Sequence, residues 1–321
     1  MIVNQWLRIL IGFLSLIFLA ATGDLLRQGE EMFAVDKLAE AADVFERVLA
    51  QEPGSARARY MLGRVRFLEG DLDSALKELE KAVDLGPENV EHRLFLAKLY
   101  GQKTRGAAFL AAPFWARKWL RELETSHRLE PANVEARSRL FQYYINAPAI
   151  GGGDKKAAIE LAKETIALDE TRGRLLLAEA YRKTDRLDEA VGEYEKLLAL
   201  DPVNVTAHRE MGNVAMARFD QAAAEGWFRK AVEIAPEDPA ALESLGDYYA
   251  RRGMRSRAIE AYLAVLSIAP KESEARFSLA KQYEELGRTE DAARQYQMLL
   301  DLTPSSFHAP EARERLDRIK R

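Results

Sequence analysis

The residue types that most often carry enzyme chemistry are few in this chain, or they stand at spacings that common catalytic sites do not use. There is no cysteine, which excludes disulfides, thiol nucleophiles and cysteine-based zinc or iron–sulfur sites. The histidines are scattered, and no two of them stand four residues apart as in a metalloprotease helix: His92, His127, His208 and His308. We expect them to be surface or core residues, and we expect no metal site and no cofactor.

Other chemical motifs are also incomplete. Residues 151–156 read GGGDKK, which lacks the spacing and the serine or threonine of a phosphate-binding P-loop. No G-x-S-x-G nucleophile motif occurs, and no nucleophile, base and orienting residue come together in the sequence. We therefore predict that the protein is not an enzyme and has no catalytic residues.

Charge is distributed along the whole chain. The 47 Lys and Arg residues and 51 Asp and Glu residues give a formal net charge of −4. No basic face or tail stands out to hold phosphates, so nucleic acid is not an expected partner. The composition, with 48% hydrophobic residues and 11 prolines, is typical of a soluble helical protein.

An apolar run near the N-terminus bears on cellular location. It extends from Ile9 to Ala21, which fits the hydrophobic stretch of about 7 to 15 residues in a secretory signal; a helix that crosses a bilayer needs about 20. Ala21 and Gly23 fit the −3 and −1 positions of a signal peptidase site. We expect residues 1–23 to be a signal peptide and the protein to be periplasmic or secreted. The alternative is an uncleaved inner-membrane anchor formed by residues 6–21.

The elements that must position any binding site follow from an internal repeat of 34 residues. Prolines keep this spacing in both halves of the chain, at Pro53 and Pro87 and then at Pro202, Pro236, Pro270 and Pro304. Before each proline an alanine is followed four residues later by an aromatic residue or leucine, and then three later by a small or aliphatic one, as in Ala258, Tyr262 and Val265. A preceding segment carries Leu or Met and then a small residue. These offsets predict paired helices whose apolar stripes are buried only when pairs stack.

The pattern resembles the tetratricopeptide repeat family over nearly everything after the apolar run. The resemblance implies an all-α fold, a right-handed α-solenoid of about eight helix pairs over residues 24–304. Residues 305–321 are expected to form a C-terminal capping helix over the last apolar face. The units end at Pro53, Pro87, Pro131, about Glu170, Pro202, Pro236, Pro270 and Pro304.

The third and fourth units depart from the pattern, because Pro87 and Pro131 are 44 residues apart and the next interval lacks its proline. We expect insertions near residues 101–113 and 147–154, with Pro148 ending one helix and Asp154 capping the next. Similar insertions occur in some bacterial extracytoplasmic members of the family.

The first insertion is rich in aromatic residues. Phe109, Phe114 and Trp115 would form a hydrophobic anchor for a partner, since loops on a rigid array are common recognition sites. The alternative is that they pack under their own loop. We favour packing for Trp119, because its helical position points inward.

In this family the first helix of each pair lines a concave groove at fixed repeat positions. Projected onto this sequence, the early groove contains Tyr60, Arg64, Phe67, Leu94 and Lys98, an apolar and basic mixture that suits an extended or helical peptide.

The later groove is more polar. Arg209 and Asn213 match half of the carboxylate clamp by which some members bind a C-terminal peptide. Glu274 and Ser278 stand where the later basic pair of the clamp belongs, so we do not expect that function.

We therefore predict a scaffold or adaptor that binds protein or peptide segments in its groove, within an envelope assembly, secretion or export system. The alternative is a carrier of an apolar small molecule or lipid near the insertions, because the aromatic residues there would add to Tyr60 and Phe67.

Overall fold

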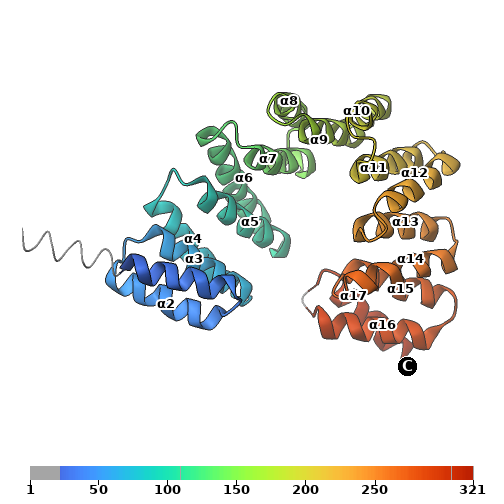
Figure 1. The fold of residues 1–321 in the computed structure, drawn as a ribbon. Helices are drawn as coiled ribbons and strands as arrows, with labels where there is room; N and C mark the ends of the chain where they lie inside the picture. Colours follow the sequence, from blue (N-terminus) through green and yellow to red (C-terminus); the bar gives the residue numbers. More distant parts are fainter. Residues whose placement is uncertain (1–21, 109, 305, 321) are drawn as a thin grey trace, which may run out of the picture. The chain divides into compact units, whose positions relative to one another are not determined.

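The computed structural model describes residues 22–108, 110–304 and 306–320, and within these ranges the chain forms helices joined by short turns, with no strand (Figure 1). In chain order they are a helix over residues 22–34, α2 (Leu38–Gln51), α3 (Ala56–Leu68), α4 (Leu72–Leu85), α5 (Val90–Gly106), α6 (Ala112–Leu129), α7 (Val134–Asn146), the 3-10 turn η1 (Ala149–Gly151), α8 (Lys155–Ile166), α9 (Glu170–Lys183), α10 (Leu187–Leu200), α11 (Val205–Ala217), α12 (Gln221–Ile234), α13 (Pro239–Arg251), α14 (Arg255–Ile268), α15 (Ser273–Glu285), α16 (Thr289–Leu302) and α17 (Ala309–Ile319). The predicted all-α fold is confirmed.

Consecutive helices pack as pairs. Helix α3 contacts α4 and α5 contacts α6, and the same holds for α9 with α10, α11 with α12, α13 with α14 and α15 with α16. The second helix of a pair then contacts the first helix of the next, as α4 does α5 and α12 does α13. This is the stacking of helix pairs expected for an α-solenoid. The chain divides into two compact units, of which unit 1 ends at Leu161 and unit 2 begins at Ala162.

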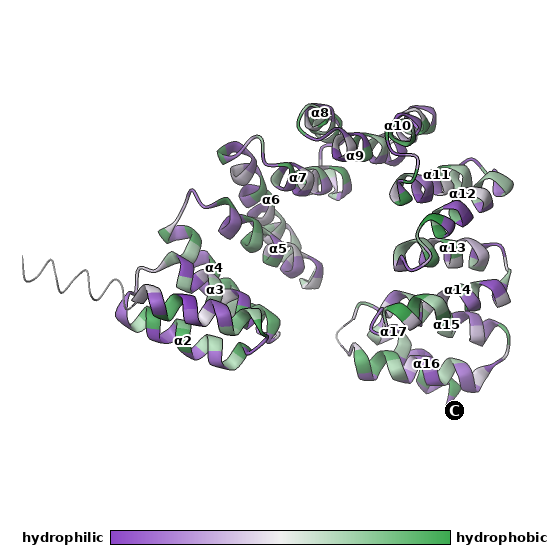
Figure 2. Ribbon diagram, viewed as in Figure 1, coloured by the Kyte–Doolittle hydropathy of each residue, from purple (hydrophilic) through white to green (hydrophobic). Residues whose placement is uncertain are grey.

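The repeat residues form the core of each pair. In α4, Ala75, Leu79 and Ala82 are fully buried, and a Cβ added to Gly63 of α3 would lie 2.7 Å from the Leu79 Cγ atom. Glycine is therefore required for the two helices to approach this closely. Hydrophilic and hydrophobic residues are mixed along individual helices (Figure 2).

Helix starts are marked by capping side chains. A side-chain oxygen of the N-cap residue accepts a hydrogen bond from a backbone N–H of the first turn at Ser55, Asp71, Asn89, Asn133, Asp169, Asn204, Asp220 and Asp238. These bonds satisfy donors that the helix itself leaves free.

The third helix pair, α5 and α6, differs from the expected arrangement. The insertion predicted near residues 101–113 is mostly helical, because α5 has 17 residues and α6 has 18, against 13 in α3 and 14 in α4. Only residues 107–111 connect the two helices. The chain has no proline between Gly101 and Pro113, and none of the described residues in this stretch has a left-handed backbone, so α5 continues through residues that we expected to form a loop.

The insertion at residues 147–154 has the expected helix ends. Helix α7 ends at Asn146, and the Asp154 Oδ1 atom accepts hydrogen bonds from the backbone N–H groups of Lys156 (2.9 Å) and Ala157 (3.0 Å). A Cβ added to Gly153 would lie 1.9 Å from the Ala147 carbonyl oxygen, which explains a glycine at this position.

The C-terminal helix α17 packs against α16, and it buries Ala309, Ala312 and Leu316. A helix at the end of the repeats is thus present, as the family resemblance implies. Residues 1–21, which carry most of the expected signal peptide and its alternative anchor, lie outside the described residues. No helix in the described part of the chain is long and apolar enough to span a membrane.

Candidate functional site

The residues expected in the early groove lie on the first helices of the second and third pairs. Tyr60, Arg64 and Phe67 stand at i, i+4 and i+7 of α3, and they therefore share one face. Lys98 follows Leu94 by four residues on α5. All five belong to unit 1.

Four aromatic rings and two cations meet on this face, and we call them the aromatic–cation cluster: Phe33, Tyr60, Phe67, Phe95, Arg64 and Lys98. The Phe95 ring packs edge-on against both Tyr60, at 5.8 Å between centroids, and Phe67, at 5.6 Å. Tyr60 and Phe67 are thus linked through a ring from the next repeat. Aromatic pairs in this geometry add to the stability gained from burial.

Both cations of the cluster lie over aromatic rings. The Arg64 guanidinium carbon is 4.6 Å from the Phe33 centroid and 5.6 Å from that of Tyr60. The Lys98 ammonium is 4.7 Å from the centroid of Phe67 and 5.3 Å from that of Phe95. Arg64 is half-buried and Lys98 is exposed, and neither forms an ion pair with any carboxylate in the described ranges. Their charges remain available to a ligand.

A polar network of Glu91, Arg57 and Glu30 holds Tyr60 in place. Its side chain is buried, and its hydroxyl donates a hydrogen bond of 3.0 Å to Glu91. Burial and the hydrogen bond with Glu91 raise its pKa to about 12, so the phenol is neutral at physiological pH. Arg57 binds Glu91 at 3.0 Å and Glu30 at 2.7 Å. The buried His92 ring stacks on Tyr60 with 4.5 Å between centroids, and burial lowers its pKa.

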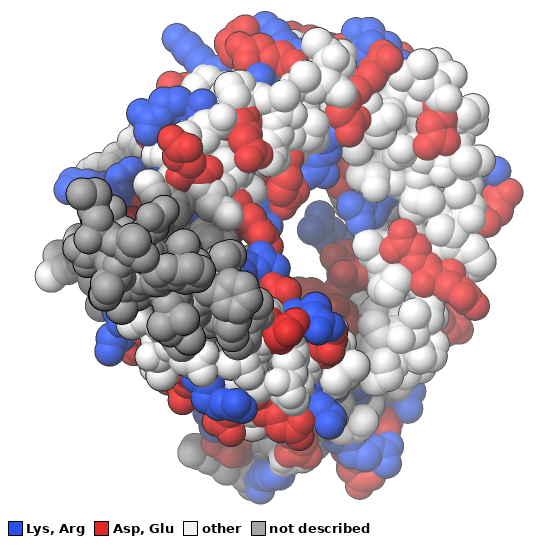
Figure 3. All heavy atoms as spheres, turned by 60° about the vertical axis from the view of Figure 1, so that its left-hand side comes forward, with Lys and Arg blue, Asp and Glu red and all other residues white. Residues whose placement is uncertain are grey.

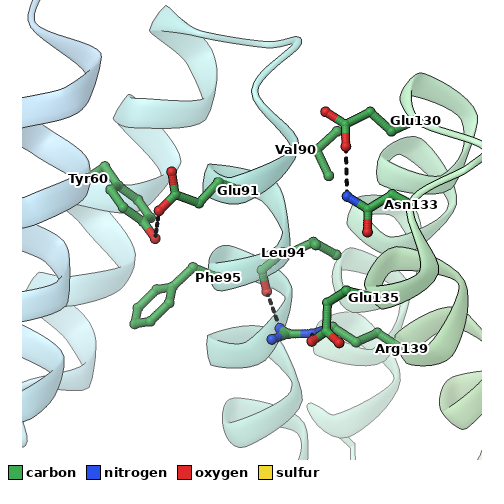
Figure 4. A pocket seen from close by; sticks show the side chains of 9 residues that line it. All are labelled: Tyr60, Val90, Glu91, Leu94, Phe95, Glu130, Asn133, Glu135 and Arg139. Atoms are coloured by element: carbon green, nitrogen blue, oxygen red, sulfur yellow. Dashed lines mark hydrogen bonds and ion pairs between the residues drawn. The ribbon is translucent and has the colours of Figure 1, made fainter.

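Leu94, like Tyr60, does not present its side chain to the groove as expected, because Leu94 is only 8% exposed and Tyr60 only 3%. The Leu94 carbonyl oxygen accepts a hydrogen bond of 3.0 Å from Arg139 of α7. Both residues line a pocket of about 370 Å³ next to the cluster (Figure 4). The pocket is also lined by Tyr60, Val90, Glu91, Phe95, Glu130, Asn133 and Glu135. Figure 4 shows Tyr60 and Phe95 on one side of it and Arg139 on the other.

The aromatic residues of the first insertion form a separate group. Phe114 is 54% exposed and packs edge-on against Trp115 at 5.0 Å, and Trp115 lies 6.0 Å from Tyr100. Among the residues that the structure describes, no ring contact joins Phe114 or Trp115 to the aromatic–cation cluster. Phe109 lies outside the described residues.

Trp119 packs inside the repeat, as expected. Its ring packs edge-on against that of Tyr143, with 4.9 Å between centroids. A Cβ added to Gly101 would lie 3.1 Å from the Trp119 ring. The small residue of the usual pattern has thus moved from the second helix to Gly101 on the first.

Arg209 and Asn213 belong to unit 2, whereas the residues of the early groove belong to unit 1. Arg209 lies 3.7 Å from the carboxylate of Glu210. Arg209 also interacts electrostatically with Glu243 and lowers the pKa of that carboxyl. Burial first, and then Asp247, Glu272 and Glu274, nevertheless raise the pKa of Glu243 to about 7. The surroundings of Arg209 are therefore acidic, which does not suit a carboxylate clamp.

The repeat positions do not predict Phe95, which contacts four other members of the cluster. It stands next to the expected position of Leu94, and its aromatic type was the available signal. Figure 3 shows Lys and Arg interspersed with Asp and Glu over the face in view, without a large patch of one sign. In the described ranges, no three His, Asp or Glu side chains are grouped to hold a metal ion.

Stacked helix pairs of 34 residues with side chains exposed along their first helices define an α-helical repeat protein. Models of the tetratricopeptide repeat match residues 32–99 and residues 149–203, 175–239 and 243–307. Because these matches cover more than half of the chain, the protein belongs to the tetratricopeptide repeat family.

One solved structure agrees with this fold. The chain is similar to a tetratricopeptide repeat protein from Parabacteroides merdae ATCC 43184, with a TM-score of 0.61 and 16% identity over 94% of this chain and 99% of that one. It also matches a thermophilic protein of this family from Thermus thermophilus, with a TM-score of 0.44 and 24% identity over 61% of this chain and 99% of that one. At such identities the likeness shows the fold alone. No curated protein matches the sequence.

Proposed function

We propose that this protein is a non-catalytic scaffold and that the aromatic–cation cluster binds a segment of a partner protein. The observation that carries the proposal is the pair of cations, Arg64 and Lys98, which lie over aromatic rings without a carboxylate partner in the described ranges. Membership of a family whose repeats mediate protein–protein interactions supports the same function.

The chemistry of the cluster indicates which segments would bind. The half-buried rings of Phe33, Phe67 and Phe95 offer apolar contact area at low entropic cost, since an aromatic side chain has few rotatable bonds. Cations held over those rings would pair with a carboxylate of the ligand in a partly desolvated place. The partner segment is therefore extended or helical and carries apolar side chains beside an acidic one. Because packed helices hold the cluster in place, little ordering is needed on binding.

The carrier alternative has less support. The insertion aromatics Phe114 and Trp115 lie apart from the cluster, and the pocket of about 370 Å³ is lined by three carboxylates and Arg139. An apolar ligand would leave these charged groups poorly solvated.

The compartment is part of the proposal. The apolar run from Ile9 to Ala21 supports a protein exported through a signal peptide, with partners in an envelope assembly, secretion or export system. N-terminal sequencing of the mature protein tests this: a chain that starts at Asp24 is expected, and a chain that retains residues 6–21 would indicate an anchored protein.

The binding function is tested by crosslinking in envelope fractions, with a photo-reactive residue in place of Phe33 at the edge of the cluster. The captured segment should carry acidic and apolar residues, and a synthetic copy of it should bind the purified protein. A captured segment that binds the Arg64→Ala/Lys98→Ala variant as tightly as it binds the natural protein would refute the proposal.

A further inference from the structure

The turn between the two helices of a repeat places one residue in the left-handed backbone region. In unit 2 this position recurs every 34 residues, at Asp185 (φ 61°), Phe219 (φ 61°), Gly253 (φ 69°) and Gly287 (φ 73°). Glycine adopts this conformation freely and aspartate tolerates it, whereas a bulky side chain brings its Cβ too close to the neighbouring carbonyl group. Phe219 is therefore the one strained residue of this set.

The backbone at Phe219 closes the turn, since its N–H donates a hydrogen bond of 3.1 Å to Met216 and that of Asp220 one of 2.9 Å to Ala215, but the Phe219 side chain adds no packing among the described residues. Its side chain is 85% exposed, and the structure gives it no ring contact with a described residue. In unit 1, the turns after the helix over residues 22–34 and after α3 use aspartate or glycine at this position, at Asp36 and Gly70. An exposed aromatic ring on strained backbone is a feature that stability alone does not explain, and such outliers concentrate at functional positions.

Consecutive turns of unit 2 lie next to one another. The Tyr248 hydroxyl donates a hydrogen bond of 2.9 Å to the carbonyl oxygen of Gln221, which joins the end of α13 to the turn that contains Phe219. An ion pair of 3.0 Å between Arg255 and Glu285 joins the following two turns. Phe219 thus lies on one edge with the turns at residues 252–254 and 286–288.

A pocket and two exposed arginines lie at the turn that follows α13. The pocket has a volume of about 450 Å³ and is lined by Gly253, Met254, Arg255, Ser256, Arg257 and Leu286. Leu286 is 44% exposed and supplies an apolar wall. The sequence from Arg251 to Arg257 reads RRGMRSR, and Arg255 and Arg257 pair with glutamates. Exposed Arg251 interacts electrostatically with Asp247 and Arg252 with Tyr248, but neither forms an ion pair with a carboxylate that the structure describes.

We propose that this turn edge of unit 2, formed by Phe219, Arg251, Arg252, Met254 and Leu286, is a second protein-binding surface. Its partner is an acidic protein segment that also carries apolar side chains. Phe219 supplies the aromatic contact, the pocket at Met254 and Leu286 receives an apolar side chain, and the exposed Arg251 and Arg252 pair with carboxylates of the partner. The surface is separate from the aromatic–cation cluster of unit 1.

The strain gives the proposal a test that does not depend on the partner. Phe219→Gly should raise the midpoint of thermal unfolding by about 2–4 °C, because it relieves the left-handed conformation without removing a packed side chain. Asp185→Gly, the matched change one repeat earlier, should alter the midpoint much less. A midpoint lowered by Phe219→Gly would show that the ring serves the fold, and the proposal would fail.

Binding is measured in the Arg64→Ala/Lys98→Ala background, so that the aromatic–cation cluster does not contribute. The probe is a fluorescein-labelled peptide of about 12 residues made of Glu, Asp, Leu and Phe, and its control has Lys in place of every acidic residue. Fluorescence anisotropy should show binding of the acidic peptide alone. Affinity should fall about tenfold or more in Phe219→Gly and in Arg251→Ser/Arg252→Ser, and it should be unchanged in Asp185→Gly.

Other occupants of the turn edge give different results. Concentration-dependent dimerisation that Phe219→Gly abolishes would assign the edge to a second copy of the chain. Sedimentation with phosphatidylglycerol vesicles that the same change abolishes would assign it to a lipid surface. Either result, or equal affinity of the acidic peptide for all variants, would overturn the proposal.

Discussion

Arg64 lies over the ring of Phe33, with 4.6 Å between the guanidinium carbon and the ring centroid. The two residues come from consecutive repeats, since Phe33 belongs to the helix over residues 22–34 and Arg64 to α3. The same guanidinium is 5.9 Å from the ring of Phe95 in the third repeat. One cation thus touches three repeats, and its position depends on how they stack.

The first prediction concerns binding by this cation and its neighbour. Arg64→Ala/Lys98→Ala should weaken binding of the crosslinked partner segment by about 10–100-fold, because two charge-assisted contacts are lost. Stability should fall by only about 0.5–1 kcal/mol per cation, the usual value for a solvent-accessible cation over an aromatic ring. Isothermal titration calorimetry and urea unfolding measure the two effects.

Lys281→Ala is the matched control for this double variant. Lys281 has the same repeat position in α15 and lies 5.7 Å from the centroid of Phe277, but it belongs to unit 2. An equal loss of affinity in Lys281→Ala would mean that binding depends on overall charge and not on the cluster.

The second prediction compares two glycines of one repeat. A Cβ added to Gly212 would lie 2.7 Å from Cε1 of the buried Phe228, so Gly212→Ala should destabilise the protein by about 1–3 kcal/mol. Gly226 lies inside α12 with nothing within 4 Å of an added Cβ, and Gly226→Ala should stabilise it by about 0.5–1 kcal/mol. Urea unfolding of both variants checks the opposite signs. Two changes of the same sign would contradict the close approach of α11 and α12.

The third prediction separates packing from recognition in the first insertion. Trp119→Ala should cost about 3 kcal/mol, because its ring fills the space between Gly101 and Tyr143. Phe114→Ala should cost less than about 1 kcal/mol, since more than half of the side chain is exposed. Thermal unfolding ranks the two variants, and the reverse order would show that Phe114 is the structural residue.

These residues also show why sequence predicts the fold better than the site. The 34-residue proline spacing identifies the repeats because each helix pair must bury the same stripe, with a small residue such as Gly63 opposite a large one such as Leu79. The extent of the insertion at residues 101–113 was wrong because nothing stops α5 before Gly106. The 44-residue interval between Pro87 and Pro131 predicts extra residues near 101–113, but it does not say whether they are helical.

Local register places Tyr60, Arg64, Phe67 and Lys98 on one surface, but it does not determine burial. Leu94 is buried, and its carbonyl oxygen accepts a hydrogen bond from Arg139 of the next repeat. Phe95 joins the cluster through contacts with residues of α3 that are about 30 positions earlier in the chain. Such contacts between repeats depend on how helices pack, and a repeat-position rule does not contain them.

The last prediction is a pH dependence centred on Glu243 of α13. Burial first, and then the nearby Asp247, Glu272 and Glu274, raise its pKa to about 7, while Arg209 acts in the opposite direction. The folded protein therefore holds this proton more tightly than the unfolded chain, whose carboxyl has an ordinary pKa of 4.5. Above about pH 7 the ionised carboxylate destabilises the fold, and this contribution disappears as the pH falls toward about 5.

Glu243→Gln should accordingly raise the thermal midpoint above that of the natural protein at about pH 8, and the difference should shrink toward about pH 5. Asp291→Asn is the control of opposite sign. Hydrogen bonds with Arg288 and Arg294 lower the pKa of Asp291, so its stabilising charge is present throughout this pH range and the variant should have a lower midpoint at both pH values. Differential scanning calorimetry measures these midpoints. A Glu243→Gln difference that does not change with pH would mean that Glu243 ionises normally in the folded protein.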